Sequence, residues 1–298
     1  MTAEKTRLRV ILPGGGVKGA FQLGALTAIL GTGRYTIDAV YGCSIGAILA
    51  PLVSVENVAK ITTLFNGIRD VSDVLQRRTW LCGLVEYPEW TVVQGLSSFL
   101  QLGAYQSVKL VDTMLQSLTQ EELALAQSRC HVVAYDLLNN QERWFTGSEL
   151  AVGVRCSSAL WLAVPPISYG GTLYSDGGAT EVFPVTYILE HELSGPAFDG
   201  VYVFIDCDAR TPYTTPAPTD GLSLMSALQW AAASRLAEFE LQRLKRELLS
   251  PLEIIRPASN LLNSALDIDP ARMKATFDAG AAAGLHVITT RECRLAVA

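Results

Sequence analysis

The apolar positions of the chain fall into short strand-like runs that alternate with longer helix-like runs. RLRVIL (7–12) and DAVYG (38–42) have the composition of buried strands. Helix-like segments follow at 19–30 and 44–53, and the second is expected to continue as helix over 55–68. A strand–helix–strand–helix order at this spacing predicts a mostly parallel sheet with helices on both faces.

The rest of the chain continues this alternation and adds two hairpins. RCHVVAYDLL and QERWFT, joined by Asn139-Asn140, predict one hairpin, and ISYGGTLYSDGG (167–178) predicts another. Further strands are expected at 200–206 and 252–257. Further helices are expected at 107–118, 148–160, 222–249 and 269–285. Thr119 and Glu122 form a capping box that indicates the start of another helix directly after residue 118. A surface loop is expected at 211–221. We find no repeat and no strong boundary, so residues 1–298 are expected to form one three-layer α/β domain.

Two apolar stretches each have a second interpretation. Residues 39–55 carry no charge over 17 residues, which is at the lower edge for a membrane span. Their two glycines, two serines and proline favour a buried strand that runs into a buried helix. Residues 80–104 contain several aromatic residues and few charges, so this segment is either a lid that contacts lipid or an ordinary core insertion.

Composition and charge exclude some classes of function. Half of the residues are hydrophobic (49%), so a large core can form. The net charge of −6 argues against binding to nucleic acid. The six cysteines form no C-x-x-C pair and are expected to be reduced core thiols rather than zinc ligands. The N-terminal residues do not have the pattern of a signal peptide, and a cytoplasmic location is expected.

The first candidate motif is Gly42-Cys43-Ser44-Ile45-Gly46, a G-x-S-x-G between a predicted strand and a predicted helix. A sharp strand-to-helix turn in this position lifts the serine out of the sheet, and small flanking residues leave room for the backbone. Ser44 is therefore a candidate nucleophile, while Cys43 is expected to be packed in the core. The alternative is a tight turn with an incidental serine.

The second motif is Gly14-Gly15-Gly16-Val17-Lys18-Gly19, which matches the dinucleotide pattern G-x-G-x-x-G. A dinucleotide site also needs an acidic residue at the far end of the second strand, and Asp38 is expected at its entrance instead. The glycines suit amide donors for an oxyanion, because a carbonyl oxygen can approach them closely. Lys18 could add positive charge to this loop, although a solvated side chain at a helix start is the simpler expectation.

The third motif is Asp176-Gly177-Gly178, which alone would indicate only a turn. Acyl transfer needs a nucleophile, a base and oxyanion donors, and the three motifs can supply them as Ser44, Asp176 and the glycine loop.

In this order, GGGVKG, GCSIG and SSALWLAVPPISYGGTLYSDGG resemble the motifs of the patatin-like phospholipases. The resemblance extends from about residue 7 to about 285 and includes the helix-like DIDPARMKATFDAG. It implies hydrolysis of fatty acyl esters of lipids by a Ser–Asp dyad. Ser44 would be the nucleophile, Asp176 its partner and Gly14, Gly15 and Gly16 the oxyanion loop. Pro13 departs from the family pattern, since many members have a polar residue there.

Other assignments stay open at this point. A Ser–His–Asp triad that uses His191 or His286 is possible, because histidine is the usual base, whereas His131 is expected in a strand core. A module that binds nucleotide phosphates through the glycine loop is the alternative from another class. The expected partner is a membrane phospholipid or another lipid ester, with peripheral membrane contact. We expect no metal and no cofactor, and the oligomeric state is open.

Overall fold

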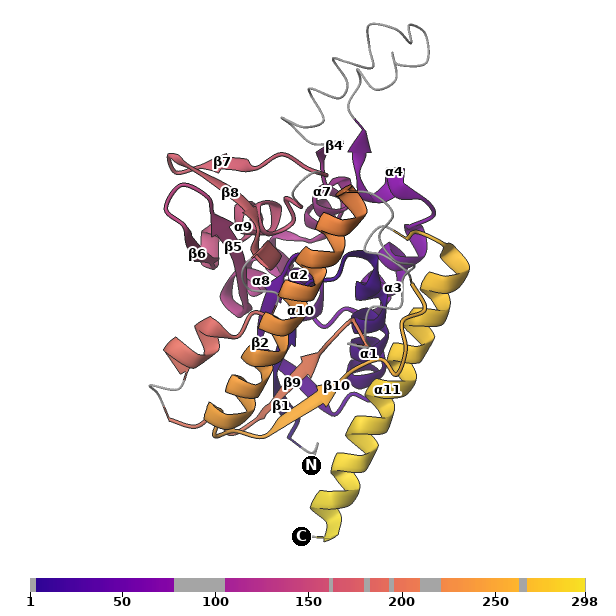
Figure 1. Cartoon of the computed structure of the whole chain (residues 1–298). Coiled ribbons are helices and arrows are strands. Elements are labelled where there is room, and N and C mark those ends of the chain that lie inside the picture. The colour runs from indigo at the N-terminus through magenta and orange to yellow at the C-terminus, as the bar shows by residue number, and fades with distance from the viewer. Residues whose placement is uncertain are drawn as a thin grey trace, which may run out of the picture.

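The computed structural model describes residues 4–77, 105–160, 163–179, 183–192, 196–209, 221–262 and 267–297 (Figure 1). The lid or insertion expected at 80–104 lies outside these residues, as does almost all of the loop expected at 211–221.

A central sheet organises the fold. Within the described residues it has eight strands in the order β10-β9-β1-β2-β5-β8-β7, with β6 paired to β5. The strands from β10 to β5 are parallel, while β6, β7 and β8 join as antiparallel hairpins. Their bounds are β1 Thr6–Leu12, β2 Tyr35–Cys43, β5 Cys130–Asp136, β6 Gln141–Phe145, β7 Ile167–Tyr169, β8 Thr172–Asp176, β9 Val201–Ile205 and β10 Leu252–Ile255. A separate ribbon pairs β3 (Gln76–Arg77) with β4 (Tyr105–Ser107).

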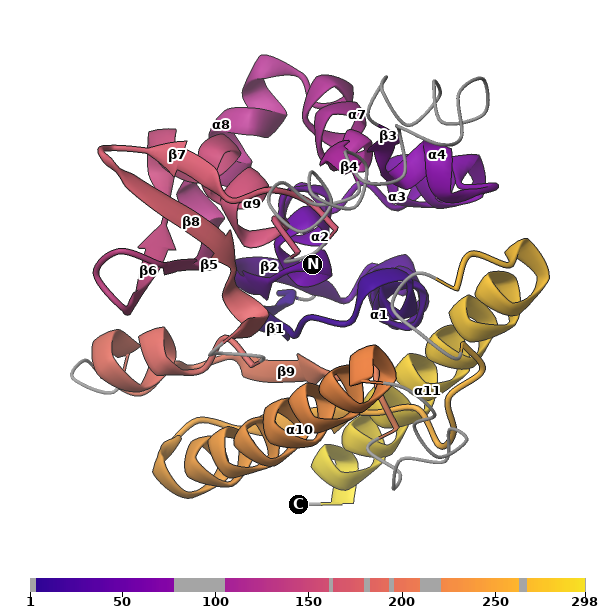
Figure 2. The same cartoon turned by 45° about the horizontal axis from the view of Figure 1, so that its top comes forward.

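Helices cover both faces of the sheet, which confirms the predicted three-layer α/β fold (Figure 2). In β1, Leu8 and Val10 point to the core on the α1 side of the sheet. Ile11 points to the opposite face, where it belongs to the core that includes α10. The helices are α1 Ala20–Gly31, α2 Ile45–Ser54, α3 Val58–Gly67, α4 Val71–Val74, α7 Lys109–Ser117, α8 Gln120–Arg129, α9 Leu150–Ser157, α10 Gly221–Glu247 and α11 Pro270–Val297. Short 3-10 or π turns are η1 Gly16–Gly19, η2 Gly147–Glu149, η3 Gly177–Ala179 and η4 Ile188–Glu192.

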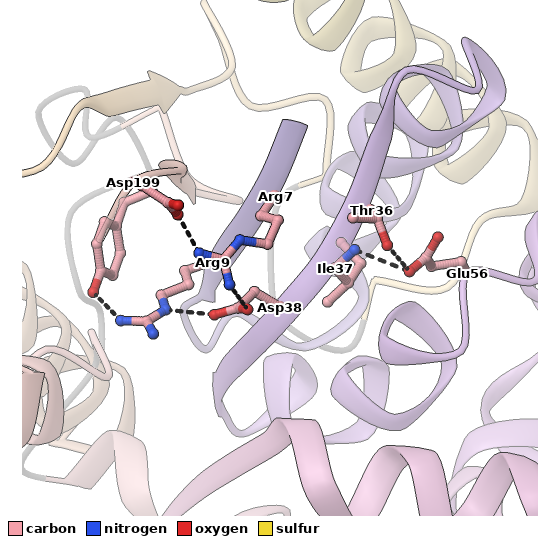
Figure 3. Close-up of polar contacts among 8 residues, drawn as sticks. Arg7, Arg9, Thr36, Ile37, Asp38, Glu56 and Asp199 are labelled. Carbon is pink, nitrogen blue, oxygen red and sulfur yellow. Dashed lines mark hydrogen bonds and ion pairs between the residues drawn. The ribbon is translucent and has the colours of Figure 1, made fainter. Parts of the chain in front are cut away.

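The helix expected over 44–68 is broken in two. Glu56 adopts a positive φ of 57°, and the side chain of Asn57 then caps α3. The Glu56 carboxylate accepts hydrogen bonds from the Thr36 hydroxyl at 2.7 Å and the Ile37 amide at 3.0 Å (Figure 3). These bonds hold the break against β2. The uncharged stretch 39–55 is thus the end of β2 followed by α2, and no described helix has the length and hydropathy of a membrane span.

The C-terminal helix α11 is longer than expected and packs tightly along α1 (Figure 1). Glycines make this approach possible. A Cβ at Gly24 would lie 1.9 Å from the carbonyl oxygen of Phe277, and one at Gly280 would lie 2.1 Å from that of Phe21. The helix that carries the glycine loop is therefore fixed from outside by the last helix of the chain.

Asp38 lies inside β2, because this strand starts at Tyr35 rather than at residue 38. Its carboxylate pairs with Arg7 at 3.2 Å and with Arg9 at 2.8 Å, and Arg7 also bonds Asp199 (Figure 3). Six residues of strand separate Asp38 from Ser44, a distance of about 20 Å. Arg7 and Arg9 therefore bind the Asp38 carboxylate inside β2, away from the strand end that carries Ser44.

Candidate active site

Ser44 lies at the sharp turn between β2 and α2, as the G-x-S-x-G motif predicts. Its backbone has φ 54° and ψ −120°, a conformation that costs a side-chain-bearing residue free energy. The flanking glycines make the turn possible: a Cβ at Gly46 would lie 2.0 Å from the Leu12 carbonyl oxygen, and one at Gly42 would lie 2.6 Å from that of Gly46. The turn presents the Ser44 hydroxyl beyond the end of β2.

Asp176, the last residue of β8, meets Ser44 although 132 positions separate them in the chain. The Ser44 Oγ donates to Asp176 Oδ2 at 2.6 Å, and the Gly178 amide donates to Oδ1 at 2.8 Å. Burial raises the pKa of Asp176 to about 6, and the two hydrogen bonds partly oppose that rise. A Cβ at Gly177 would lie 2.6 Å from the Val133 carbonyl oxygen, so the glycine after Asp176 is needed for close packing on β5.

The glycine loop lies beside the nucleophile. A Cβ at Gly14 would lie 3.1 Å from the Cβ of Ser44 and 3.8 Å from its Oγ. Gly16 adopts a positive φ of 59°, and a Cβ at Gly15 would lie 2.1 Å from Sγ of Cys207. The structure therefore brings Gly14, Ser44 and Asp176 together at one end of the sheet.

Lys18 differs from its expected role as a solvated residue. Its Nζ forms an ion pair with Asp208 Oδ2 at 2.7 Å, and the two side chains are only 12% and 10% exposed. Asp208 also accepts from the Asn260 amide group at 2.9 Å. Lys18 is not solvated because Asp208, just after β9, lies next to it, and no local pattern around Lys18 indicates this distant partner. At the same turn, a Cβ at Gly19 would lie 2.5 Å from Cγ1 of Ile45.

Gln22, which the sequence reasoning missed, fastens the loop from behind. Its side-chain amide is fully buried and donates to the carbonyl oxygens of Pro13 and Ile205, both at 3.0 Å. The Cys207 thiol donates to the Gly14 carbonyl oxygen at 3.1 Å. A lone glutamine in an otherwise apolar helix was the available signal, because buried amides need partners.

Ser157, near the end of α9, was also missed as a site residue. Its fully buried Oγ accepts the backbone amide of Ser44 at 2.9 Å. Ser157 is the first residue of the motif SSALWLAVPPISYGGTLYSDGG, and no local pattern there indicates its contact with Ser44.

The histidines do not join this site. Within the described residues, the carboxylate oxygens of Asp176 are engaged by Ser44 and Gly178. His131 stacks on Tyr41 in the sheet core, and burial lowers its pKa to about 4. His191 is exposed on η4, and His286 is exposed on α11.

Cys43, Cys130, Cys156 and Cys207 are buried, as expected for core thiols. Cys43, directly before the nucleophile, is fully buried, which agrees with its predicted packing role. Cys43, Cys130, Cys156 and Cys207 form no disulfide bond within the part of the chain that the structure describes.

A pocket leads from Ser44 and Asp176 between the helices on one face of the sheet. It encloses about 890 Å³, part of which is open to solvent. Its walls come from α1, α2, α3 and α7, with contributions from Leu23, Leu49, Phe65, Leu110 and Met114. Among the described residues that line it, Asp176 is the only ionisable one. The pocket can therefore hold an apolar chain with one end at the serine hydroxyl.

The solved structures that resemble this chain include two bacterial proteins. VipD from Legionella pneumophila is 15% identical, with a TM-score of 0.45 over 97% of this chain and 67% of that one. The ExoU–SpcU complex of the Pseudomonas aeruginosa type III secretion system contains a chain that is 14% identical, with a TM-score of 0.26 over 97% of this chain and 60% of that one.

The family comparison is more direct. The family model described as patatin-like phospholipase matches residues 10–189, a span that includes the glycine loop, Ser44 and Asp176. This chain belongs to the patatin-like phospholipase family.

Proposed function

We propose that this protein is a lipid acyl hydrolase of the phospholipase A type that uses Ser44 as nucleophile and Asp176 as its base. The observation that carries the proposal is the 2.6 Å hydrogen bond between these side chains at the mouth of an apolar pocket. A carboxylate with a pKa of about 6 is a better proton acceptor than an ordinary aspartate. The direct contact means that no histidine is needed between nucleophile and base.

The reaction proceeds through an acyl-enzyme. Ser44 Oγ attacks the ester carbonyl carbon while Asp176 takes its proton, and a tetrahedral oxyanion forms. The oxyanion collapses, the lipid alkoxide leaves, and Asp176 returns the proton to it. A water molecule then attacks the acyl carbon and gives a proton to Asp176. The second tetrahedral intermediate collapses, the bond to Ser44 Oγ breaks, and Asp176 returns the proton to Oγ as the fatty acid leaves.

The oxyanion donors are the backbone amides of the glycine loop, with Gly15 and Gly16 as the principal donors. The approach of Gly14 to Ser44 supports this assignment. The amide of Ser44 itself already bonds Ser157. Loss of one donor of this kind costs about 10²–10³ in rate.

The substrate is an ester with a long acyl chain. The pocket is lined almost entirely by aliphatic and aromatic side chains. Binding is favourable when an apolar ligand leaves water for these walls, whereas a polar group would lose its hydrogen bonds to water there. A fatty acyl chain fits these walls with its carbonyl carbon at Ser44.

The protein meets its substrate at a membrane surface through peripheral contact. Leu137, Leu138 and Leu173 are exposed at the tips of the β5–β6 and β7–β8 hairpins, and Leu138 is 62% exposed. The Leu137 amide donates to the Leu173 carbonyl oxygen, so Leu137, directly after β5, lies beside Leu173 on β8. Leu173 is three residues before Asp176 on β8, about 10 Å along the strand.

A fluorophosphonate probe tests the dyad. We expect labelling of the wild type, loss of labelling in Ser44→Ala, and retained labelling in His191→Ala and His286→Ala. Lipid hydrolysis should persist in EDTA, because the dyad supplies both nucleophile and base. Loss of labelling in a histidine variant would favour a triad, and tight nucleotide binding without labelling would favour a phosphate-binding module.

A further inference from the structure

The two dyad residues lie on strands that are not neighbours. Ser44 follows β2 and Asp176 ends β8, and β5 lies between these strands in the sheet. Two strand spacings amount to about 10 Å, so the side chains must reach across β5 near Ala134, the residue paired with Asp176, to meet at 2.6 Å. Sheet pairing alone leaves this contact sensitive to small shifts of either strand end.

One element touches both strand ends. At the end of α9, the Ser157 Oγ accepts the Ser44 amide at 2.9 Å. Two residues later, the Ala159 carbonyl oxygen accepts the Asp176 amide at 3.0 Å and the Ser175 hydroxyl at 3.1 Å. Three consecutive residues, 157 to 159, therefore hold the backbone of the nucleophile and the backbone of the base.

This element is itself firmly seated. Ser157 and Ala159 are fully buried. A Cβ at Gly153 would lie 2.2 Å from Cβ of Phe145, so α9 packs directly on β6. The Ser44 amide precedes the first residue of α2, and Ser157 supplies the acceptor for this half-buried donor.

We propose that Ser157 is a positioning residue for the Ser44–Asp176 reaction, and that it acts with the Ala159 carbonyl as a clamp on both halves of the dyad. The proposal rests on the proposed function for its kinetic consequence and on the hydrogen bonds of Ser157 and Ala159 for its geometry. By engaging the Ser44 amide, Ser157 also leaves oxyanion stabilisation to the glycine loop.

Three variants separate the hydrogen bond from packing. Ser157→Ala removes the acceptor, and Ser157→Cys keeps most of the volume but supplies only a weak acceptor. We expect kcat and the rate of fluorophosphonate labelling to fall at least about tenfold in both, since small displacements of reacting groups are costly. KM should change less than about twofold. Ser157→Thr retains the hydroxyl and should restore kcat to within about threefold of wild type.

The matched control is Ser54→Ala. Ser54 is also a fully buried serine at a helix end, but its hydroxyl bonds the Pro51 carbonyl oxygen within its own helix. Its removal should leave kcat unchanged while thermal stability falls as much as in Ser157→Ala. Equal loss of kcat in the two alanine variants would overturn the proposal.

A crystal structure of Ser157→Ala tests the clamp independently of activity. We expect the Ser44 Oγ to Asp176 Oδ2 separation to exceed hydrogen-bond distance. A separation unchanged from wild type would overturn the clamp even if the lipase activity is real. A wild type that is not labelled at Ser44, together with a displaced dyad in the variant, would instead reject the proposed function and keep the clamp.

Discussion

The Nζ of Lys18 lies 2.7 Å from Oδ2 of Asp208, and this nearly buried ion pair ties the glycine loop to the chain after β9. Ionic groups that are buried lose their hydration, so removal of the Lys18 ammonium would leave the Asp208 carboxylate with an uncompensated charge that destabilises the fold. Lys18→Met should therefore lower the free energy of unfolding by about 3 kcal/mol.

Chemical denaturation measures this effect, and Lys274→Met is its control. Lys274 pairs with Asp278 on the surface of α11, where the side chains are 62% and 57% exposed. Exposed pairs of this kind contribute less than about 1 kcal/mol. Similar losses in the two variants would show that the Lys18 pair has no special structural role.

The contact between Gly15 and Cys207 predicts a compensating pair of substitutions. In Gly15→Ala the new Cβ would lie 2.1 Å from the sulfur, so the glycine loop and the Cys207 side chain must shift relative to each other. We expect hydrolysis to fall about 100-fold or more, because oxyanion donors must be accurately placed. Cys207→Ala removes the sulfur and leaves its Cβ at 3.6 Å, an ordinary contact. The double variant should recover much of the activity.

Gly31→Ala is the control for this pair. A Cβ there meets nothing within 4 Å, and alanine favours helix, so activity should be unchanged. If Gly15→Ala is as active as Gly31→Ala, the loop is not an oxyanion site.

The raised pKa of Asp176 predicts the pH dependence of hydrolysis. The carboxylate must be ionised to accept the serine proton, and its pKa is about 6. The value of kcat/KM should therefore rise about tenfold per pH unit below 6 and level off above it. A soluble short-chain ester measured from pH 4.5 to 8 tests this. A profile that continues to rise through pH 7 would point to a different base.

The same shift predicts a pH-dependent stability. Burial raises the pKa of Asp176 from its ordinary value of 3.8 to about 6, so the folded state binds the proton more tightly than the unfolded state. Its contribution is fully favourable below pH 4 and is lost as pH rises through 6. Asp176→Asn does not titrate there.

Urea unfolding of Asp176→Asn and wild type at several pH values measures the difference. Between pH 4 and pH 8, the stability difference should shift by about 3 kcal/mol in favour of the variant. A difference that does not change with pH would mean that Asp176 titrates near its ordinary value.

The exposed leucines at the hairpin tips predict weaker attachment to lipid when they are made polar. Leu137→Ser with Leu138→Ser should reduce binding to phosphatidylcholine vesicles about tenfold or more, because two apolar side chains no longer leave water. Hydrolysis of a soluble ester should stay unchanged.

Leu249→Ser provides the matched control. Leu249 is 82% exposed between α10 and β10, away from the hairpin tips, and its substitution should not affect vesicle binding. If the double variant binds vesicles as wild type does, the membrane contact lies elsewhere.

Some of the site could be predicted because its chemistry is local. The turn around Ser44 depends on glycines two residues away on each side, and Asp176 is followed directly by the glycines that its packing requires. The order of strands and helices also follows from periodicity, which reports burial over short windows. Local sequence was therefore enough to predict the fold class, the turn at the nucleophile and the two hairpins.

Other features depend on residues that meet only after folding. The break at Glu56 depends on partners in β2, and the pairing of Lys18 depends on Asp208, 190 positions away. The buried serine that holds the Ser44 amide comes from a helix 113 positions downstream.

The sequence by itself determined the alternating α/β pattern, the serine turn and the identity of the candidate dyad. Only the tertiary structure decided that Asp176 meets Ser44 without a histidine between them, that both line an apolar pocket, and that Ser157 accepts the Ser44 amide. The physical reason is that local conformation depends on neighbours along the chain, whereas hydrogen bonds, desolvation and cavity walls depend on neighbours in space.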